Sequence, residues 1–318
     1  MKISTLEKNY SANGAAPSAI RLTVPGDCAG LRLDQALAGL LHQYSRTRLS
    51  AWIREARVTV NGKPAQPRDK VWGGEAITVQ PAADPHSLAF SPEAIPLDVV
   101  FEDDTLLVVD KPAGLVVHPG SGNWQGTLLN ALLQHAPSLR EIPRAGIVHR
   151  LDKETSGLLV VAKTLIAQTA LVRQLQAHTV TREYAAIARG HVARGGMVEA
   201  PIGRHPVHRT RMAVVAHGKA AVTHYEVLER YADATLLRCR LETGRTHQIR
   251  VHLASIGHPL IGDPVYGSRG GSAVPFHRQA LHAERLSLPH PVSGKALDWR
   301  SPLPADMQQL IATLRARA

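Results

Sequence analysis

The chain has 318 residues, 44% of them hydrophobic, which is enough for a substantial core and for two domains. Its formal net charge of +11 favours a polyanionic partner, either a nucleic acid or an anionic membrane surface. No apolar run is long enough for a membrane span, and the first residues lack the apolar stretch of a signal peptide. The two cysteines, Cys28 and Cys239, are too far apart in sequence for zinc or disulfide-framework spacing. We therefore expect a soluble, cytoplasmic protein without a metal site.

The first part of the chain predicts a tail and a small basic module. Residues 1–20 are small and polar, which is typical of a flexible tail. Within residues 21–80, four leucines from Leu33 to Leu41 fall at helical spacing, and Ser45 can cap a second helix. Val58–Val60 followed by Asn61-Gly62 predicts a strand that enters a tight turn.

The second helix of this module carries Arg46, Arg48 and Arg54, which we take as candidate contacts to an RNA backbone. The alternative is an ordinary solvated basic helix. Between residues 31 and 70 there are eight Lys/Arg and three Asp/Glu. The order of Arg32-Leu33-Asp34, Ser45-Arg46 and the turn after Val60 resembles the S4 RNA-binding domain. The resemblance implies an α/β module that binds RNA.

Residues 81–96 contain four prolines and predict a linker, so a larger domain is expected over residues 97–318. Its periodicities predict an α+β fold in which strands and helices are mixed. Strands are expected near 99–101, 106–109, 158–163, 181–190 and 236–243, a hairpin at 280–300, and helices near 127–133, 165–175, 247–256 and 306–314.

The most informative stretch is the polar loop from Ile147 to Gly157, which is followed directly by a buried strand. A polar loop on a rigid strand is where catalytic groups tend to lie. Asp152 in this loop has Arg150 two residues before it and Lys153 directly after it. Nearby cations favour the ionised carboxylate, which can act as a base or a nucleophile. The alternative is a surface turn with solvated charges.

Three further regions carry candidate residues. Lys111 and His118 flank a loop rich in proline and glycine and could contact phosphate or be solvated. Tyr184 is either a core residue or a site residue. Arg245 lies at a strand-to-helix corner, where Thr246 could cap the helix and an anion could bind.

Residues 203–225 are basic and rich in histidine, and they predict an exposed hairpin or arm suited to phosphates. Arg204, Arg209 and Arg211 are the candidate contacts. The alternative is a mobile surface loop.

Taken together, these segments resemble the RluA-type pseudouridine synthase family. The stretch from His149 to Leu158 is similar to the central motif of that family, Arg182-Glu183-Tyr184 to its second motif, and Leu241 through His252 to its third. Lys111 through Gly120 and Gly262 through Gly267 also match in order. The likeness runs from about residue 31 to the C-terminus and implies a pseudouridine synthase fold, with a mixed, largely antiparallel sheet and flanking helices.

The resemblance implies that the protein converts specific uridines in RNA to pseudouridine without a cofactor, a metal or a redox group. Asp152 would be the essential carboxylate, and Arg245 would pair with it. Tyr184 would stack against the flipped uracil, and Ile249 would form an apolar wall under it or belong to the core. Arg150 would fill the space left by the base or hold a phosphate.

With the S4-like module in front of these motifs, the chain resembles those members of the family that modify helix 69 of 23S rRNA in the bacterial large ribosomal subunit. The expected partner is therefore 23S rRNA or an assembling large subunit, with the protein acting as a monomer. Two alternatives stay open. The same chemistry could act on another rRNA site or a tRNA, or the fold could serve a non-catalytic RNA-binding protein of ribosome assembly.

Charge reversal at Arg46, Arg48 and Arg54 tests the role of the module. We expect the triple variant of the full chain to bind RNA more weakly, and its affinity to depend less steeply on salt. Each phosphate contact that is lost means that fewer counterions are released when the RNA binds. RNA affinity measured across a salt series checks this. Unchanged affinity and slope would remove the module from RNA binding.

Overall fold

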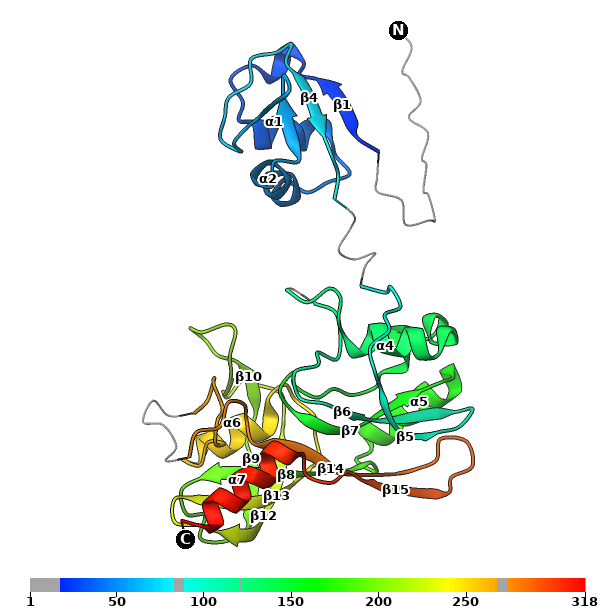
Figure 1. Cartoon of the computed structure of the whole chain (residues 1–318), viewed down its shortest axis with the longest axis vertical. Coiled ribbons are helices and arrows are strands. Elements are labelled where there is room, and N and C mark those ends of the chain that lie inside the picture. Colours follow the sequence, from blue (N-terminus) through cyan, green and yellow to red (C-terminus); the bar gives the residue numbers. More distant parts are fainter. Residues whose placement is uncertain (1–17, 83–88, 121, 268–273, 318) are drawn as a thin grey trace. The chain divides into compact units, whose positions relative to one another are not determined.

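The computed structural model describes residues 18–82, 89–120, 122–267 and 274–317. The chain divides into two compact units, Met1–Leu88 and Ala89–Ala318 (Figure 1). The division falls inside the predicted linker, but the end of that segment is attached to the second unit. The Glu93 amide donates to Asn130 O, and the Glu93 carboxylate accepts from the Gly126 amide. Ala89 is also buried.

The first unit is a four-stranded antiparallel sheet covered by two helices. The sheet order is β1-β4-β2-β3. Its elements are β1 (Ile20–Thr23), a 3-10 turn (Gly26–Cys28), α1 (Leu33–Leu40), α2 (Arg46–Arg54), β2 (Val58–Val60), β3 (Lys63–Pro64) and β4 (Ala76–Val79). Ser45 caps α2 through the Arg48 amide, as predicted. The predicted tail reached residue 20, but Ile20 already belongs to β1, and residues 1–17 lie outside the described ranges.

The second unit is built on one nine-stranded sheet. The strand order is β5-β6-β7-β14-β8-β13-β12-β9, and β15 also pairs with β14. All pairings are antiparallel except that of β7 with β14, so the sheet is mixed and largely antiparallel, as expected. The strands are β5 (Asp98–Glu102), β6 (Leu106–Lys111), β7 (Ser156–Ala162), β8 (Thr181–Arg189), β9 (Gly196–Glu199), β12 (Val222–Arg230), β13 (Ala234–Leu241), β14 (Leu281–Pro289) and β15 (Ala296–Arg300).

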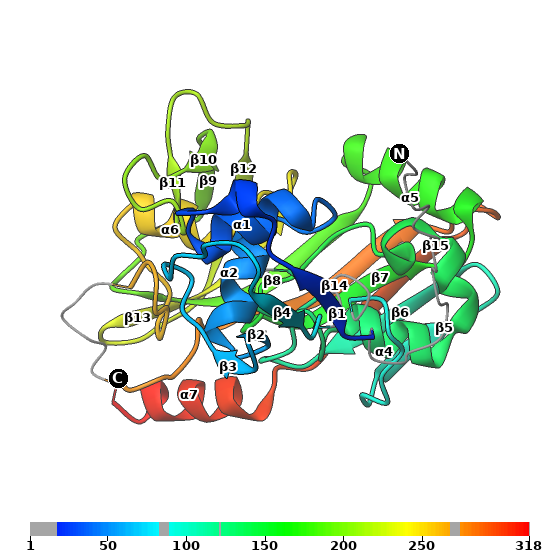
Figure 2. The same cartoon turned by 90° about the horizontal axis from the view of Figure 1, so that it is seen from above.

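Helices cover both faces of this sheet. Alternate residues of a strand point to opposite faces, so each strand serves two cores. On one face, α4 (Leu128–His135) and α6 (Gln248–Ser255) pack on residues such as Val109 and Ala186. On the other face, α5 (Leu165–Gln176) and α7 (Ala305–Arg315) lie at opposite ends of the sheet (Figure 2). Two 3-10 turns, Pro137–Glu141 and Pro143–Gly146, follow α4, and a small hairpin of β10 (Ile202–Arg204) and β11 (Met212–Val214) stands beside α6.

Close backbone approaches fix where the loop before β7 enters the sheet. Gly157 has φ +112°, and a Cβ atom there would lie 2.3 Å from Ala283 O on the neighbouring strand β14. Gly146 has φ +75°, and a Cβ atom there would lie 1.9 Å from Ala162 O. Only glycine satisfies both the left-handed backbone and the missing space, so the two glycines set both ends of the loop that contains Asp152.

The substitution Gly157→Ala tests this close approach. We expect it to lower the free energy of unfolding by at least about 3 kcal/mol, because the strands must separate and the backbone is strained. Gly114→Ala is the matched control, since Gly114 also has positive φ but open space around a Cβ atom. That control should cost only about 1 kcal/mol. Urea titrations followed by circular dichroism measure both, and equal losses would contradict the packing argument.

Candidate active site

Asp152 lies in a loop that hydrogen bonds hold on both sides. Before it, His149 Nε2 accepts the Val160 amide at 3.1 Å, so this ring is bound to strand β7. Burial lowers the pKa of His149 to about 3, which keeps the ring neutral and able to accept. After it, Lys153 O accepts from the Gly114 amide and from Lys111 Nζ. The loop is therefore a fixed support for the carboxylate rather than a solvated turn.

Lys111 has a structural position that its sequence context did not predict. Its side chain is only 1% exposed, and Nζ donates to Pro112 O at 2.6 Å, Leu115 O at 3.0 Å and Lys153 O at 3.0 Å. Burial lowers its pKa to about 7, against the attraction of Glu154 and Asp152. The expectation that Lys111 contacts phosphate or is solvated is wrong, because its three donors are used inside the protein.

The residues that follow Lys153 are anchored by the segment before β14. Arg278 Nη1 donates to Glu154 O at 3.1 Å, and Gln279 Nε2 donates to Thr155 Oγ1 at 3.1 Å. Arg278 is itself held by Asp306 at the start of α7, with Nε to Oδ2 at 2.6 Å. Elements far apart in the sequence thus fix the backbone next to Asp152.

The partner of Asp152 is Arg250. Arg250 Nη1 donates to Asp152 Oδ2 at 2.9 Å, and the same guanidinium donates through Nε and Nη2 to Asp263 at 2.7 and 3.0 Å. The side chain of Asp263 is fully buried, and that of Asp152 is 16% exposed. Burial opposes ionisation of Asp263, but hydrogen bonds from Arg250 hold its pKa below the ordinary value. Arg250 thus binds Oδ2 of Asp152, whereas Oδ1 accepts no hydrogen bond from the residues that the structure describes.

The prediction that Arg245 pairs with Asp152 is wrong. Helix α6 begins at Gln248 and not after a Thr246 cap, and the Gln248 side chain accepts the Arg245 amide at 2.9 Å. Arg245 therefore lies on the exposed turn before the helix, where its Nε donates to Ala220 O. The missed residues are Arg250 and Asp263. A signal was available, since Arg250 precedes the core residue Leu253 by three positions, which brings it to the buried side of the helix.

Tyr184 and Ile249 lie in the core cluster that also contains Leu151, next to Asp152. Tyr184 on β8 is 5% exposed, and burial raises its pKa. Ile249 is 3% exposed. The structure places both residues in the core, so their contact with a flipped uracil stays a prediction.

Arg150 and His118 lie at the exposed side of the loop. The Arg150 side chain is exposed, whereas His118 is half-buried. Burial lowers the pKa of His118 to about 4, and the cations Arg144 and Arg150 act in the same direction. His118 is therefore a neutral group near two arginines and not itself a cation for phosphate.

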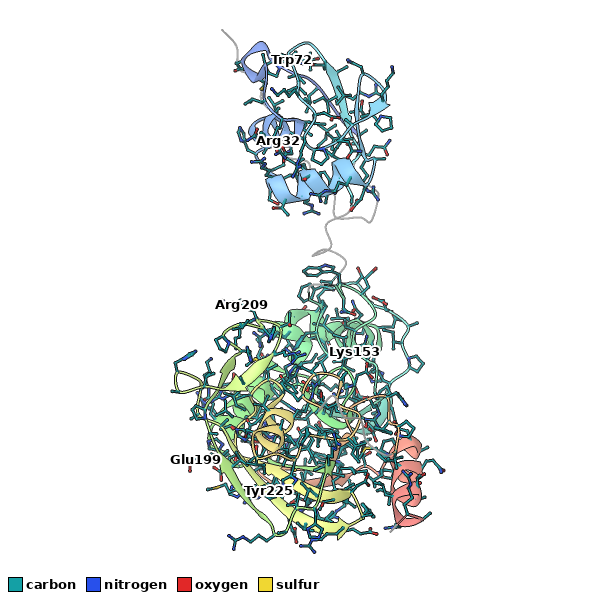
Figure 3. The ribbon with its side chains drawn as sticks, turned by 90° about the vertical axis from the view of Figure 1, so that its left-hand side faces the viewer. Arg32, Trp72, Lys153, Glu199, Arg209 and Tyr225 are labelled. Atoms are coloured by element: carbon teal, nitrogen blue, oxygen red, sulfur yellow. The ribbon has the colours of Figure 1, made fainter. Side chains whose placement is uncertain are left out.

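The first part of the predicted basic arm is the β10–β11 hairpin, with Arg204, Arg209 and Arg211 all exposed. The prediction of an exposed arm is wrong for residues 222–225, which begin strand β12 of the large sheet. Figure 3 shows Arg209 at the edge of the second unit. A hollow of about 610 Å³ lies at the base of the hairpin. Its basic lining residues are Arg204, His205, Arg209, His217, Lys219 and Arg245. Arg245 thus belongs with the arm rather than with Asp152.

In the first unit, the three candidate arginines differ in their contacts. Arg46 is paired with buried Asp34 at 3.0 Å, and Arg54 donates to Ser50 Oγ at 2.9 Å. Arg48 lies over the Trp52 ring, with 5.3 Å between its guanidinium carbon and the ring centroid. Burial opposes ionisation of Asp34, but the arginines bonded to it lower its pKa. Arg46 therefore stabilises the first unit through Asp34, and its side chain is also exposed to solvent.

In the described parts of the chain, no group of three or more His, Cys, Asp or Glu side chains could hold a metal ion. None of the helices in those parts combines the length and apolar character needed to cross a membrane.

The fold and the motifs have clear counterparts among known proteins. The RNA pseudouridylate synthase family model matches residues 105–255, and the S4 domain model matches residues 31–77. The chain belongs to the RNA pseudouridine synthase family and is an isomerase that acts on RNA.

Particular relatives narrow the comparison. The chain is 58% identical over 322 aligned positions to the ribosomal large subunit pseudouridine synthase D of Nitrosomonas europaea, covering 97% of this chain and 94% of that protein. It is 53% identical to the protein of the same name from Escherichia coli K12, covering 92% and 94%. The solved structure of human RNA Pseudouridylate Synthase Domain Containing 1 matches with a TM-score of 0.54 and 28% identity, covering 70% of this chain and 96% of that one.

Substitution of the two arginines distinguishes Arg250 from Arg245. We expect Arg250→Gln to lower the free energy of unfolding by about 3–5 kcal/mol, because Asp263 and Asp152 lose the cation between them. Arg245→Gln should change it by no more than about 0.5 kcal/mol, since this side chain is on the surface. Urea denaturation of both variants measures the difference, and similar values for the two would refute the assignment.

Proposed function

We propose that this protein isomerises specific uridines of 23S rRNA, in helix 69 of the large ribosomal subunit, with Asp152 as the essential carboxylate. The observation that carries the proposal is the partly exposed Asp152 carboxyl group held by Arg250 on an anchored loop. The large-subunit target is supported by the names of the relatives and by the S4 domain. We further propose that it acts in the cytoplasm as a monomer, with residues 21–80 as the S4 domain, 81–96 as a linker and 97–318 as the catalytic domain.

The geometry supplies the chemistry that this reaction needs. The bond between the ribose carbon and N1 of uracil breaks, the base turns, a bond forms to C5, and the C5 proton leaves. Asp152 Oδ1, which Arg250 does not bind, is the oxygen available to attack the sugar or to remove a ribose proton. The target nucleotide must be flipped out of its stack to reach this oxygen.

Apolar residues beside Asp152 suit a flipped base. Tyr184, Ile249 and Leu151 belong to one core cluster, and we assign to them the apolar wall that keeps water from the uracil. Exclusion of water retains the detached base and disfavours simple hydrolysis. Tyr184 provides the stacking face. Its raised pKa makes it a poor base unless binding of RNA changes its surroundings.

Binding of the surrounding RNA is assigned to exposed cations. Arg150 and the hollow at the base of the β10–β11 hairpin, which includes Arg204, Arg209 and Arg245, lie on the second unit. Arg211 follows on the same hairpin. Phosphate contacts of this kind position a nucleic acid without reading its sequence, so the choice of uridine depends on the shape of the RNA.

The second candidate is the same chemistry on another rRNA site or a tRNA, because substrate choice lies in loops and the arm and not in the motifs. A comparison of modified positions in RNA from cells with and without the protein separates the two. A purely non-catalytic role in ribosome assembly is not favoured, since such a role needs no partly exposed aspartate held by a buried arginine on an anchored loop.

The substitution Asp152→Asn tests the chemistry directly on a labelled 23S rRNA fragment that contains helix 69. We expect wild type to form pseudouridine, and the variant to bind the fragment but to form no product, because an amide can neither attack nor accept the proton. Glu154→Gln is the matched control, as it removes a neighbouring carboxylate from the same loop and should retain activity.

The outcomes of this assay separate target from residue. An active Asp152→Asn enzyme would refute the role of Asp152. Binding without product by wild type would move the search to other RNAs.

A further inference from the structure

His247 has a backbone conformation and contacts that the roles above do not use. It precedes α6 with φ 57° and ψ 24°, a left-handed conformation that costs a residue with a Cβ atom about 1–2 kcal/mol. The side chain is mostly buried and lies between Asp152 and Tyr266. Nδ1 is 2.7 Å from the hydroxyl of Tyr266, and Nε2 is 3.8 Å from Asp152 Oδ1. A strained residue whose side chain points at the reactive carboxylate is a candidate for function.

The hydrogen bonds around Tyr266 favour one tautomer of His247. The Tyr266 hydroxyl accepts the Met212 amide at 2.9 Å. Its own proton is then free to be donated to His247 Nδ1, which must be unprotonated to accept it. In this arrangement the neutral ring carries its proton on Nε2, the nitrogen that faces Asp152. Burial lowers the pKa of His247. Of the charges around the ring, Asp152 and Asp263 raise this pKa, whereas Arg250 and Arg150 lower it.

We propose that His247 is a positioning residue for pseudouridine formation, which directs its Nε2–H toward the Asp152 oxygen that Arg250 leaves open. The proposal rests on the proposed role of Asp152. The present separation of 3.8 Å is too long for a hydrogen bond, and an approach of less than about 1 Å would form one. Asp152 would then be held by Arg250 on Oδ2 and oriented by His247 on Oδ1.

The same contacts connect the carboxylate to the arm. Met212 belongs to strand β11, whose hairpin carries the exposed arginines assigned to RNA. The chain of contacts from Met212 through Tyr266 and His247 ends at Asp152. Tyr266 also faces Arg250, with 5.1 Å from the guanidinium carbon to the ring centroid. These contacts place His247 between the arm and the carboxylate.

Two substitutions of His247 give opposite predictions for a positioning role and a structural role. The amide nitrogen of glutamine can replace Nε2, whereas the shorter asparagine can replace only Nδ1. Asparagine, however, tolerates the left-handed backbone better than glutamine. If His247 is merely structural, His247→Asn should be the better enzyme. If it positions Asp152, His247→Gln should be.

We expect the single-turnover rate on the helix 69 fragment to fall roughly tenfold or more in His247→Asn and to stay within about threefold of wild type in His247→Gln. The Kd for the fragment should be unchanged in both, because neither change touches an exposed cation. An asparagine variant as fast as the glutamine variant would overturn the proposal.

A second measurement does not depend on the RNA. In full-length protein labelled with ¹⁵N-histidine, the His247 signal, identified by its loss in His247→Gln, should show a protonated Nε2 and an unprotonated Nδ1. Tyr266→Phe should shift the ring toward the other tautomer and slow turnover, whereas Tyr225→Phe should change neither. A protonated Nδ1 in the wild-type protein would overturn the proposal. Absence of product from wild type would instead refute the proposed substrate, and the tautomer would still decide the role of His247.

Discussion

The buried Arg250 guanidinium is the interaction on which the site depends, because it binds two carboxylates from separate segments of the chain. Removing a guanidinium and a carboxylate from water costs several kcal/mol per ion, and only good geometry offsets that cost. Arg250 uses Nε and Nη2 on Asp263 and Nη1 on Asp152. Asp263 in turn accepts the amides of Val265 and Tyr266. A misplaced helix α6 would leave these charges unpaired, so the position that stabilises the fold is also the position that forms the site.

The same requirement explains why the loop around Asp152 has so many backbone anchors. A carboxylate that waits for a flipped nucleotide must be correctly oriented before the RNA arrives, since reorganisation at that moment would add to the barrier. Lys111 and Arg278 hold the two carbonyls that follow Asp152. Both donate to neutral backbone oxygens, so they fix the loop without pairing directly with the carboxylate that it presents.

The sequence allowed prediction of the elements and of the loop that carries Asp152, but not of the tertiary contacts that hold it. Periodicity located α4, α5 and the β14–β15 hairpin because apolar spacing reflects one element at a time. The local sequence indicates Arg245 and does not single out Arg250, because an arginine in the turn before a helix resembles an anion site. Only the position of α6 against Asp263 decides between them. Likewise, nothing in the residues around Lys111 indicates that its ammonium group donates to three backbone carbonyls.

Burial divides the basic residues into a structural group and a group that is free to bind RNA. The net charge of +11 alone therefore does not describe the RNA-binding surface. Arg250, Arg278 and Lys111 are almost fully buried and bonded to protein acceptors. A phosphate could reach them only by breaking those bonds. Exposed cations such as Arg150 and Arg209 keep the freedom to follow an RNA backbone. Salt screens the attraction between the exposed cations and phosphate, but it leaves the bonds of the buried basic residues largely unaffected. High salt should therefore release RNA well before it disturbs the geometry around Asp152.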